Sequence, residues 1–269
     1  MFESITVDFL LDFQRLDDRK INRIIRITTG DSAITGGQIR RLRASSSLMY
    51  QLVNSTKLFI PSVKIKELSN EGVLVKLTIK WVKDDYTLKF KKNQKGGTRI
   101  CQDFRKEVLI ENSNPMDEGI DWFRQMCLQK NVKIGQFQIN DDSKKLTEKL
   151  DEVLKKSEIP LKIKSIHCVG TESVDLMWKI MEYCDKRLLK EMKVIKVKED
   201  DNFELFGKHD EIVKNLEKIE IDIPCNASVE DVLSLNASVI SLNSESFTEE
   251  FVYTLIEKFT NRREDGSAF

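Results

Sequence analysis

The chain has 269 residues, of which 40% are hydrophobic and 33% are charged, and its 44 basic residues balance 44 acidic ones. This length suits one large domain or two unequal ones, and the hydrophobic content is sufficient for a packed core. Balanced charge argues against a dedicated nucleic-acid or membrane-surface binder, because such proteins usually carry a basic excess. No stretch reaches about 18 apolar residues, so we expect no transmembrane helix.

The cysteines stand singly, their number is odd, and no CxxC pair occurs. They are Cys101, Cys127, Cys168, Cys184 and Cys225. This pattern predicts reduced core thiols of an intracellular protein and no zinc site. The N-terminal run "MFESITVDFLLDF" lacks the basic start and long apolar run of a signal peptide. We therefore expect the protein in the cytoplasm or the nucleus.

Residues 1–56 show a helical period of apolar residues. Two amphipathic runs are separated by the glycine-containing stretch "TTGDSAITGG". The apolar residues that share helix faces in these runs are Ile21, Ile24, Ile25, Leu48, Met49 and Leu52. The segment is predicted to form two or three short helices.

Residues 57–100 change to a period of two, which is typical of strands buried on one face. The runs "VLVKLTIKW" and "YTLKF" flank a short "KDD" and predict a hairpin. The run "LFIPSVKI" predicts a third strand, and Pro61 favours an edge position or a place near the strand start. The turn "NQKGG" is predicted to end this antiparallel β-meander.

Residues 101–260 alternate between strand-like and helix-like runs. The strand landmarks are Val132, Ile163, Val194, Ile219 and Val239, and the gaps between them are 31, 31, 25 and 20 residues. This repeat predicts leucine-rich-like strand–helix units with a mostly parallel sheet. A slip of the apolar phase near Gly135 predicts a β-bulge. Residues 261–269 are predicted to be a frayed tail.

The fold class predicted from these three parts is α/β (α+β overall). A helical N-terminal segment precedes an antiparallel β-meander, which is followed by strand–helix repeats. In the helix "SVDLMWKIMEYC", Trp178 has apolar neighbours at helical spacing and is expected to be buried facing the sheet. The helix predicted around "ELFGKHDEIVKN" is weakened by Gly207.

No catalytic constellation emerges from the sequence. His167 and Cys168 are neighbours on a strand, so they point to opposite faces and cannot act as a pair. His209 is expected to be a solvated loop residue. "NQKGGTR" lacks the phosphate-loop spacing, and no GxSxG nucleophile turn for a small α/β hydrolase occurs. We predict no catalytic, cofactor or metal site, and a protein that is not an enzyme.

Several stretches resemble the nematode F-box-associated proteins that carry an FTH domain, mainly within residues 85–260. They are "YTLKFKKNQKGG", "KNVKIGQFQI", "LKIKSIHCVGTESVDLMWKIMEYCDKRLLKEMKVIKVKE", "VKNLEKIEIDI" and "SVEDVLSLNASVISLNSESFTEEFVYTLIEKF". Residues 5–52 resemble an F-box only in helical outline, and the Leu-Pro opening typical of an F-box is missing. The chain thus reads as a degenerate F-box-like segment, residues 1–56, before an FTH-like domain, residues 57–269.

The resemblance implies a protein-recognition subunit. In that family the F-box binds the small adaptor of a cullin–RING ubiquitin ligase, and the C-terminal domain is thought to hold substrates. The candidates for adaptor binding are Ile21, Ile24, Ile25, Leu48, Met49 and Leu52. The alternative is a protein-interaction domain of the same fold with no ligase role.

Overall fold

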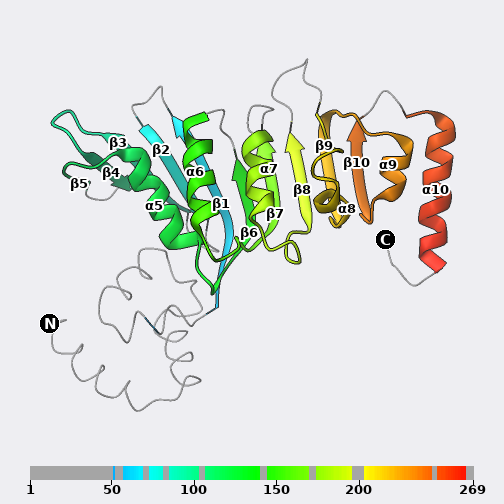
Figure 1. Ribbon diagram of the computed structural model, residues 1–269, viewed down its shortest axis with the longest axis horizontal. Coiled ribbons are helices and arrows are strands. Elements are labelled where there is room, and N and C mark those ends of the chain that lie inside the picture. Colours follow the sequence, from blue (N-terminus) through cyan, green and yellow to red (C-terminus); the bar gives the residue numbers. More distant parts are fainter. Residues whose placement is uncertain are drawn as a thin grey trace, which may run out of the picture.

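The strands of the described chain all belong to one sheet (Figure 1). The computed structural model describes residues 51, 57–68, 73–80, 85–102, 107–139, 144–169, 174–195, 203–243 and 247–264. The predicted N-terminal helical segment, with all six adaptor-binding candidates, therefore lies outside the described residues, except for Gln51.

The sheet has ten strands in the order β10-β9-β8-β7-β6-β1-β2-β3-β4-β5. Their bounds are β1 Leu58–Leu68, β2 Val73–Lys80, β3 Asp85–Lys92, β4 Thr98–Gln102, β5 Val108–Ile110, β6 Val132–Ile139, β7 Ile163–Val169, β8 Glu191–Ile195, β9 Lys218–Pro224 and β10 Val239–Asn243.

The predicted parallel sheet is confirmed. Strands β6 to β10 are neighbours in chain order and pair in parallel, and β1 pairs in parallel with β6. Parallel neighbours need a crossover segment between them, and the sequence supplies helical ones. The described helices are α5 Pro115–Cys127, α6 Lys144–Lys156, α7 Val174–Glu182, α8 Asp210–Lys214, α9 Val229–Ser234 and α10 Glu249–Glu264.

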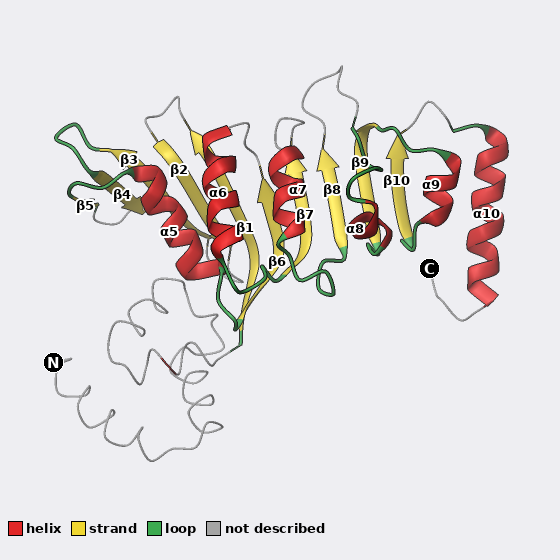
Figure 2. Cartoon of the chain, in the orientation of Figure 1, coloured by secondary structure: helices red, strands yellow, loops and turns green. Residues whose placement is uncertain are grey.

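Helices α5, α6 and α7 lie side by side over one face of the sheet (Figure 2). Side-chain N-caps begin two of the described helices. The Asn114 side chain accepts a hydrogen bond from the Met116 amide at 2.9 Å ahead of α5, and Ser228 and Asp231 form a capping box at α9. Among the described residues, no helix combines the length and apolar character that crossing a membrane requires.

The antiparallel half extends beyond its predicted end. The three predicted strands are β1, β2 and β3, but β4 and β5 continue the meander to Ile110. They escaped prediction because they are short, five and three residues long. The "NQKGG" turn is present between β3 and β4, where Gly96 and Gly97 have φ of 93° and 84°. The predicted boundary at residue 100 therefore falls within the antiparallel part.

Strand register arranges the core in rows. The apolar row runs across β1, β6, β7, β8 and β9 through Val63, Phe137, Ile166, Met192 and Ile219, all of which are buried. The adjacent row consists of Lys64, Gln138, His167, Lys193 and Glu220. Because successive side chains alternate between faces, the polar row lies on the opposite face of the sheet from the apolar row.

The cysteine and tail predictions are corrected in part. All five cysteines are free and four are buried, but Cys101 is only partly buried and its thiol donates a hydrogen bond to Glu107. It lies on β4, close to the edge of the sheet, where less of the chain covers it. Helix α10 continues to Glu264, so residues 261–264 are helical and do not belong to the predicted frayed tail.

Of the two positions predicted for Pro61, the sheet edge is not the one observed, and the place near the strand start is. β1 stands between β2 and β6, and Pro61 is its fourth residue. The apolar phase of β6 slips between Ile134 and Phe137 as predicted. The register with both neighbours nevertheless runs through this point without a shift, so the predicted bulge is wrong.

A close approach between β1 and β6 accompanies this slip. A Cβ atom on Gly135 would lie 2.6 Å from the Pro61 carbonyl oxygen and 3.0 Å from the tip of the Phe59 ring. Pro61 has no N–H to donate, and only the absence of a side chain at Gly135 allows the two backbones to come this close.

We expect Gly135→Ala to lower the free energy of unfolding by about 1–3 kcal/mol, because the methyl group must displace backbone atoms of β1. Urea denaturation measures this change. Lys133→Ala on the same strand is the control, since Lys133 is exposed and its loss should change stability by less than about 0.5 kcal/mol. A Gly135→Ala protein as stable as the wild type would show that β1 and β6 are not in this close contact.

Candidate functional site

The connection from β8 to β9 departs from the strand–helix pattern, and the departure leaves a pocket. Helices α6 and α7 have 13 and 9 residues, whereas α8 has only 5. Ahead of α8, the Phe203 amide donates a hydrogen bond to the Pro224 carbonyl at 2.8 Å. Gly207, with φ of 138°, follows in a conformation that favours glycine. The helix predicted around Gly207 therefore begins only at Asp210, and residues 203–209, here called the pocket loop, lie beside α7.

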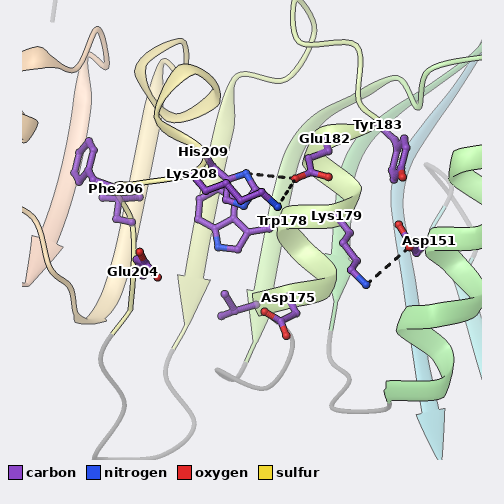
Figure 3. Close-up of a pocket in the computed structure, with 12 residues that line it drawn as sticks. Asp151, Asp175, Trp178, Lys179, Glu182, Tyr183, Glu204, Phe206, Lys208 and His209 are labelled. Carbon is purple, nitrogen blue, oxygen red and sulfur yellow. Dashed lines mark ion pairs between the residues drawn. The ribbon is translucent and has the colours of Figure 1, made fainter.

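The pocket has a volume of about 580 Å³ (Figure 3). Helix α7 and the pocket loop supply most of its lining, and α6 contributes one residue. The lining residues are Asp151, Val174, Asp175, Trp178, Lys179, Glu182, Tyr183, Glu204, Leu205, Phe206, Lys208 and His209.

Aromatic rings form the inner wall of the pocket. The Trp178 ring is stacked on His209, with centroids 4.5 Å apart and planes 11° from parallel. It is also stacked on Phe203, at 5.9 Å and 15°. Only 8% of Trp178 is exposed, so its predicted burial is confirmed. Its ring partners, however, belong to the pocket loop, and the prediction that it faces the sheet misses them.

His209 is not the solvated loop residue predicted. Its side chain is 15% exposed and packs on Trp178. Burial lowers the pKa of His209, Glu182 opposes this effect at an Nδ1–carboxylate distance of 3.6 Å, and Lys208 adds to the lowering. The imidazole is therefore neutral at pH 7. His209 is buried because the pocket loop packs against α7. Hydrophobic periodicity could not indicate this burial, because it carries no information on how a loop folds.

The charged side chains at the rim are unevenly paired. Lys179 lies 3.9 Å from Asp151, and Lys208 lies 3.6 Å from Glu182. In Figure 3 dashed lines mark these two ion pairs and the contact of His209 with Glu182. Asp175 on α7 and Glu204 on the pocket loop have no ion-pair partner among the described residues. The lining thus holds four carboxylates against two ammonium groups.

The pocket contains no serine or cysteine in its lining. The nearest cysteine in the sequence, Cys184, is buried, and burial raises its pKa, as it does for Cys127. These thiols are therefore poor nucleophiles. Among the described residues, no group of three histidine, cysteine or acidic side chains is placed to hold a metal ion.

The polar row on the opposite face of the sheet is a second surface. The Gln136 amide nitrogen lies 2.8 Å from His167 Nδ1, and Lys193 lies 3.7 Å from Glu220. His167 is half-buried, whereas Cys168 is fully buried on the face that carries the apolar row, which confirms that the two point to opposite faces. Burial lowers the pKa of His167, and Lys193 lowers it further. Several polar side chains of this surface are therefore paired with one another.

A third surface lies at the edge of the sheet that β10 forms, where α10 follows β10 in the chain (Figure 1). Here four large apolar side chains are exposed, by 47–72%. They are Val239 on β10 and Val252, Tyr253 and Ile256 on α10. On the inner side of α10, Phe251 is 3% exposed and its ring lies 4.7 Å from that of Phe247. The apolar surface of α10 therefore continues from its packed side onto its exposed side.

Comparisons with protein-family models, with curated proteins and with solved structures found no match to this chain.

Sequence reasoning missed the pocket, because Trp178 and His209 come from separate units and no spacing rule connects them. Gly207 was the available signal, since a glycine that interrupts a repeat helix marks a unit whose helix is shortened. The exposed residues of α10 were hidden for a different reason. An apolar helix stripe does not say which of its members another element covers.

We expect the free energy of unfolding to fall as the pH is lowered through 6.5, the ordinary pKa of histidine, and part of this fall to come from His209. Because folding lowers this pKa, the unfolded chain takes up a proton at a higher pH than the folded chain does. The stability due to neutral His209 is complete above pH 6.5 and is lost as the pH falls towards the folded-state pKa.

His209→Phe keeps a stacking ring and removes the titration, so the variant should lose less stability between pH 7.5 and pH 5 than the wild type. Urea denaturation across this range measures the difference, and His167→Gln separates the contribution of the other histidine. Identical pH dependence of wild type and His209→Phe would show that His209 titrates alike in the folded and unfolded chains.

Proposed function

We propose that this chain is a non-enzymatic protein-recognition subunit whose docking surface is formed by the edge strand β10 and helix α10. The observation that carries the proposal is the group of exposed apolar side chains on β10 and α10. Large apolar side chains exposed at neighbouring positions of one helix, as at Val252, Tyr253 and Ile256, are typical of protein-interaction sites.

The free edge of β10 indicates the form of the partner. The Val239 amide donates to the Glu217 carbonyl, and the Asn243 carbonyl accepts from the Cys225 amide at 2.8 Å. In a parallel ladder, alternate residues bond to opposite sides, so the backbone groups of Ile240 and Leu242 point to the outer edge. Among the described residues, no strand pairs with this edge.

β10 also lacks the residues that usually protect an edge. Its sequence, VISLN, contains no charged residue and no proline. We infer that the partner presents an extended segment that adds to β10 as a further strand and places apolar side chains against Val252 and Ile256.

The resemblance to F-box-associated proteins supports a more specific role, the substrate-binding subunit of a cullin–RING ubiquitin ligase. In this role β10 and α10 hold the substrate, and the N-terminal segment binds the adaptor through Ile21, Ile24, Ile25, Leu48, Met49 and Leu52. The alternative function is a protein-interaction domain of the same fold without a ligase. The surface on β10 and α10 would bind the partner in either function, and only adaptor binding distinguishes the two functions.

We expect Val252→Glu/Ile256→Glu to weaken binding of strand-length peptides by about tenfold or more, because burial of each large apolar side chain contributes about 1.5–3 kcal/mol. The peptides, roughly 5–10 residues long, are selected from a displayed random library on the wild-type chain and measured by fluorescence polarisation. Methylation of alternate peptide nitrogens should also abolish binding, since it removes the donors of an added strand.

Thr254→Glu is the control, because Thr254 is exposed on α10 between the two substituted positions and the change introduces one of the two added charges. If the control loses as much affinity as the double variant, or the double variant loses none, the surface on β10 and α10 is not the docking site. Dimerisation of the wild type that Val252→Glu/Ile256→Glu abolishes would identify a second copy as the occupant in place of a partner segment.

The ligase role predicts that the small cullin–RING adaptor binds residues 1–269 but neither residues 57–269 nor the Ile24→Asp/Ile25→Asp variant. Surface plasmon resonance with purified adaptor measures this, and circular dichroism checks that the variant is folded. Failure of the folded wild type to bind excludes the ligase role and leaves the interaction domain. Unfolding of the variant would instead assign Ile24 and Ile25 to a core.

A further inference from the structure

We propose that the pocket between α7 and the pocket loop is a binding site for an organic cation, a group with an apolar body and one ammonium or guanidinium head. The site is separate from the docking surface on β10 and α10, and its ligand is selected by different chemistry.

The first support is the cavity itself. Its volume of about 580 Å³ lies within the range of small-ligand pockets, about 300–1,000 Å³. The cavity exists because a shortened helix leaves space that the pocket loop does not fill. Its inner wall is buried and apolar, with Leu205 and Phe206 exposed by 1% and 6%. Such a wall suits the hydrocarbon or aromatic body of a ligand.

The Trp178 ring determines how that body is held. The ring is stacked both on His209 and on Phe203. Only 8% of Trp178 is exposed, so little of the ring face is left for a ligand to stack on, and the ligand meets the ring edge. Ring edges carry partial positive charge, and a cationic head must therefore be held elsewhere in the pocket.

The rim supplies the charge that holds it. The ammonium groups of Lys179 and Lys208 already lie beside Asp151 and Glu182. Glu204 and Asp175 approach the pocket from different walls, the pocket loop and the start of α7 (Figure 3). Neither has a cationic partner among the described residues. His209 remains neutral at pH 7 and does not offset them.

This charge pattern selects among ligands of equal size. An anion in the pocket would lie near two uncompensated carboxylates, and the two lysines could reach it only by leaving their own partners. A neutral molecule gains the apolar wall alone. A cation gains both the wall and the carboxylates, which are most effective at low ionic strength.

Three probes of nearly identical shape test the proposal on the full chain: benzylammonium, benzyl alcohol and benzoate. Proton–nitrogen NMR at pH 7 and low salt follows the Trp178 indole signal, which Trp178→Phe assigns. We expect a saturable shift with benzylammonium, a weaker one with benzyl alcohol and none with benzoate. Added salt should weaken only the binding of benzylammonium.

Charge neutralisation locates the head. Asp175→Asn/Glu204→Gln should weaken benzylammonium binding by roughly three- to tenfold, the range that two exposed ion pairs supply. The binding of benzyl alcohol should not change. Glu152→Gln is the control, because it removes an exposed carboxylate of α6 that does not line the pocket. Unchanged binding to the double variant, equal binding of benzoate, or no shift with any probe overturns the proposal.

Capped Gly-Arg-Gly and Gly-Lys-Gly peptides distinguish the two sources of such a cation. Tighter binding of either peptide than of benzylammonium identifies a side chain of a partner protein, and weaker binding identifies a free amine. Because these probes contain no strand for β10 to pair with, failure here leaves the docking proposal intact. Loss of peptide docking at α10 likewise leaves the cation site intact.

Discussion

The described chain is held together by β1, which pairs on both of its edges. It is antiparallel to β2 and parallel to β6, although β6 follows only after the whole meander and α5. Helix α5 packs across the same junction. The ring centroid of Trp122 lies 6.3 Å from that of Phe90 on β3, and the ring centroid of Phe123 lies 5.7 Å from that of Phe137 on β6. The two halves therefore share one core, and a division at residue 100 would cut through a cooperative unit. The tight passage at Pro61 and Gly135 lies within this junction.

Both candidate binding surfaces follow from irregular units rather than from the regular ones. A full strand–helix unit buries its apolar stripe against its neighbours, so regular units expose little that is distinctive. The unit between β8 and β9 has a five-residue helix, and the missing turns become a pocket. The last unit has the opposite irregularity, since α10 has 16 residues but no described strand follows it. Among the described residues no further strand covers this helix, and Val252 and Ile256 are exposed.

The sequence predicted most of the fold, because period-two and period-3.6 patterns report burial on one face. It located β6 to β10 and their parallel order, and the phase slip beside Gly135. It did not locate β4 and β5, which are too short for a period to register. It left open whether Pro61 lies at an edge or near a strand start, since nothing in a single strand shows that a glycine lies opposite. The pocket was beyond reach for the same reason: the stack of Trp178 and His209 depends on how a loop folds back, and periodicity carries no information on loops.

A partner protein that extends along the sheet from β10 towards β8 would engage both surfaces. Neighbouring strands lie about 4.8 Å apart, so a strand added to β10 would be roughly 14 Å from β8, whose connection to β9 carries the pocket. Because this distance exceeds the length of a lysine or arginine side chain, only a partner whose chain continues from the added strand towards β8 would place such a side chain at the carboxylates of Asp175 and Glu204. Binding at one site would then raise the effective concentration at the other, and the combined affinity would exceed that of either contact alone. Weak binding by isolated probes is therefore compatible with tight binding of a partner that engages both sites.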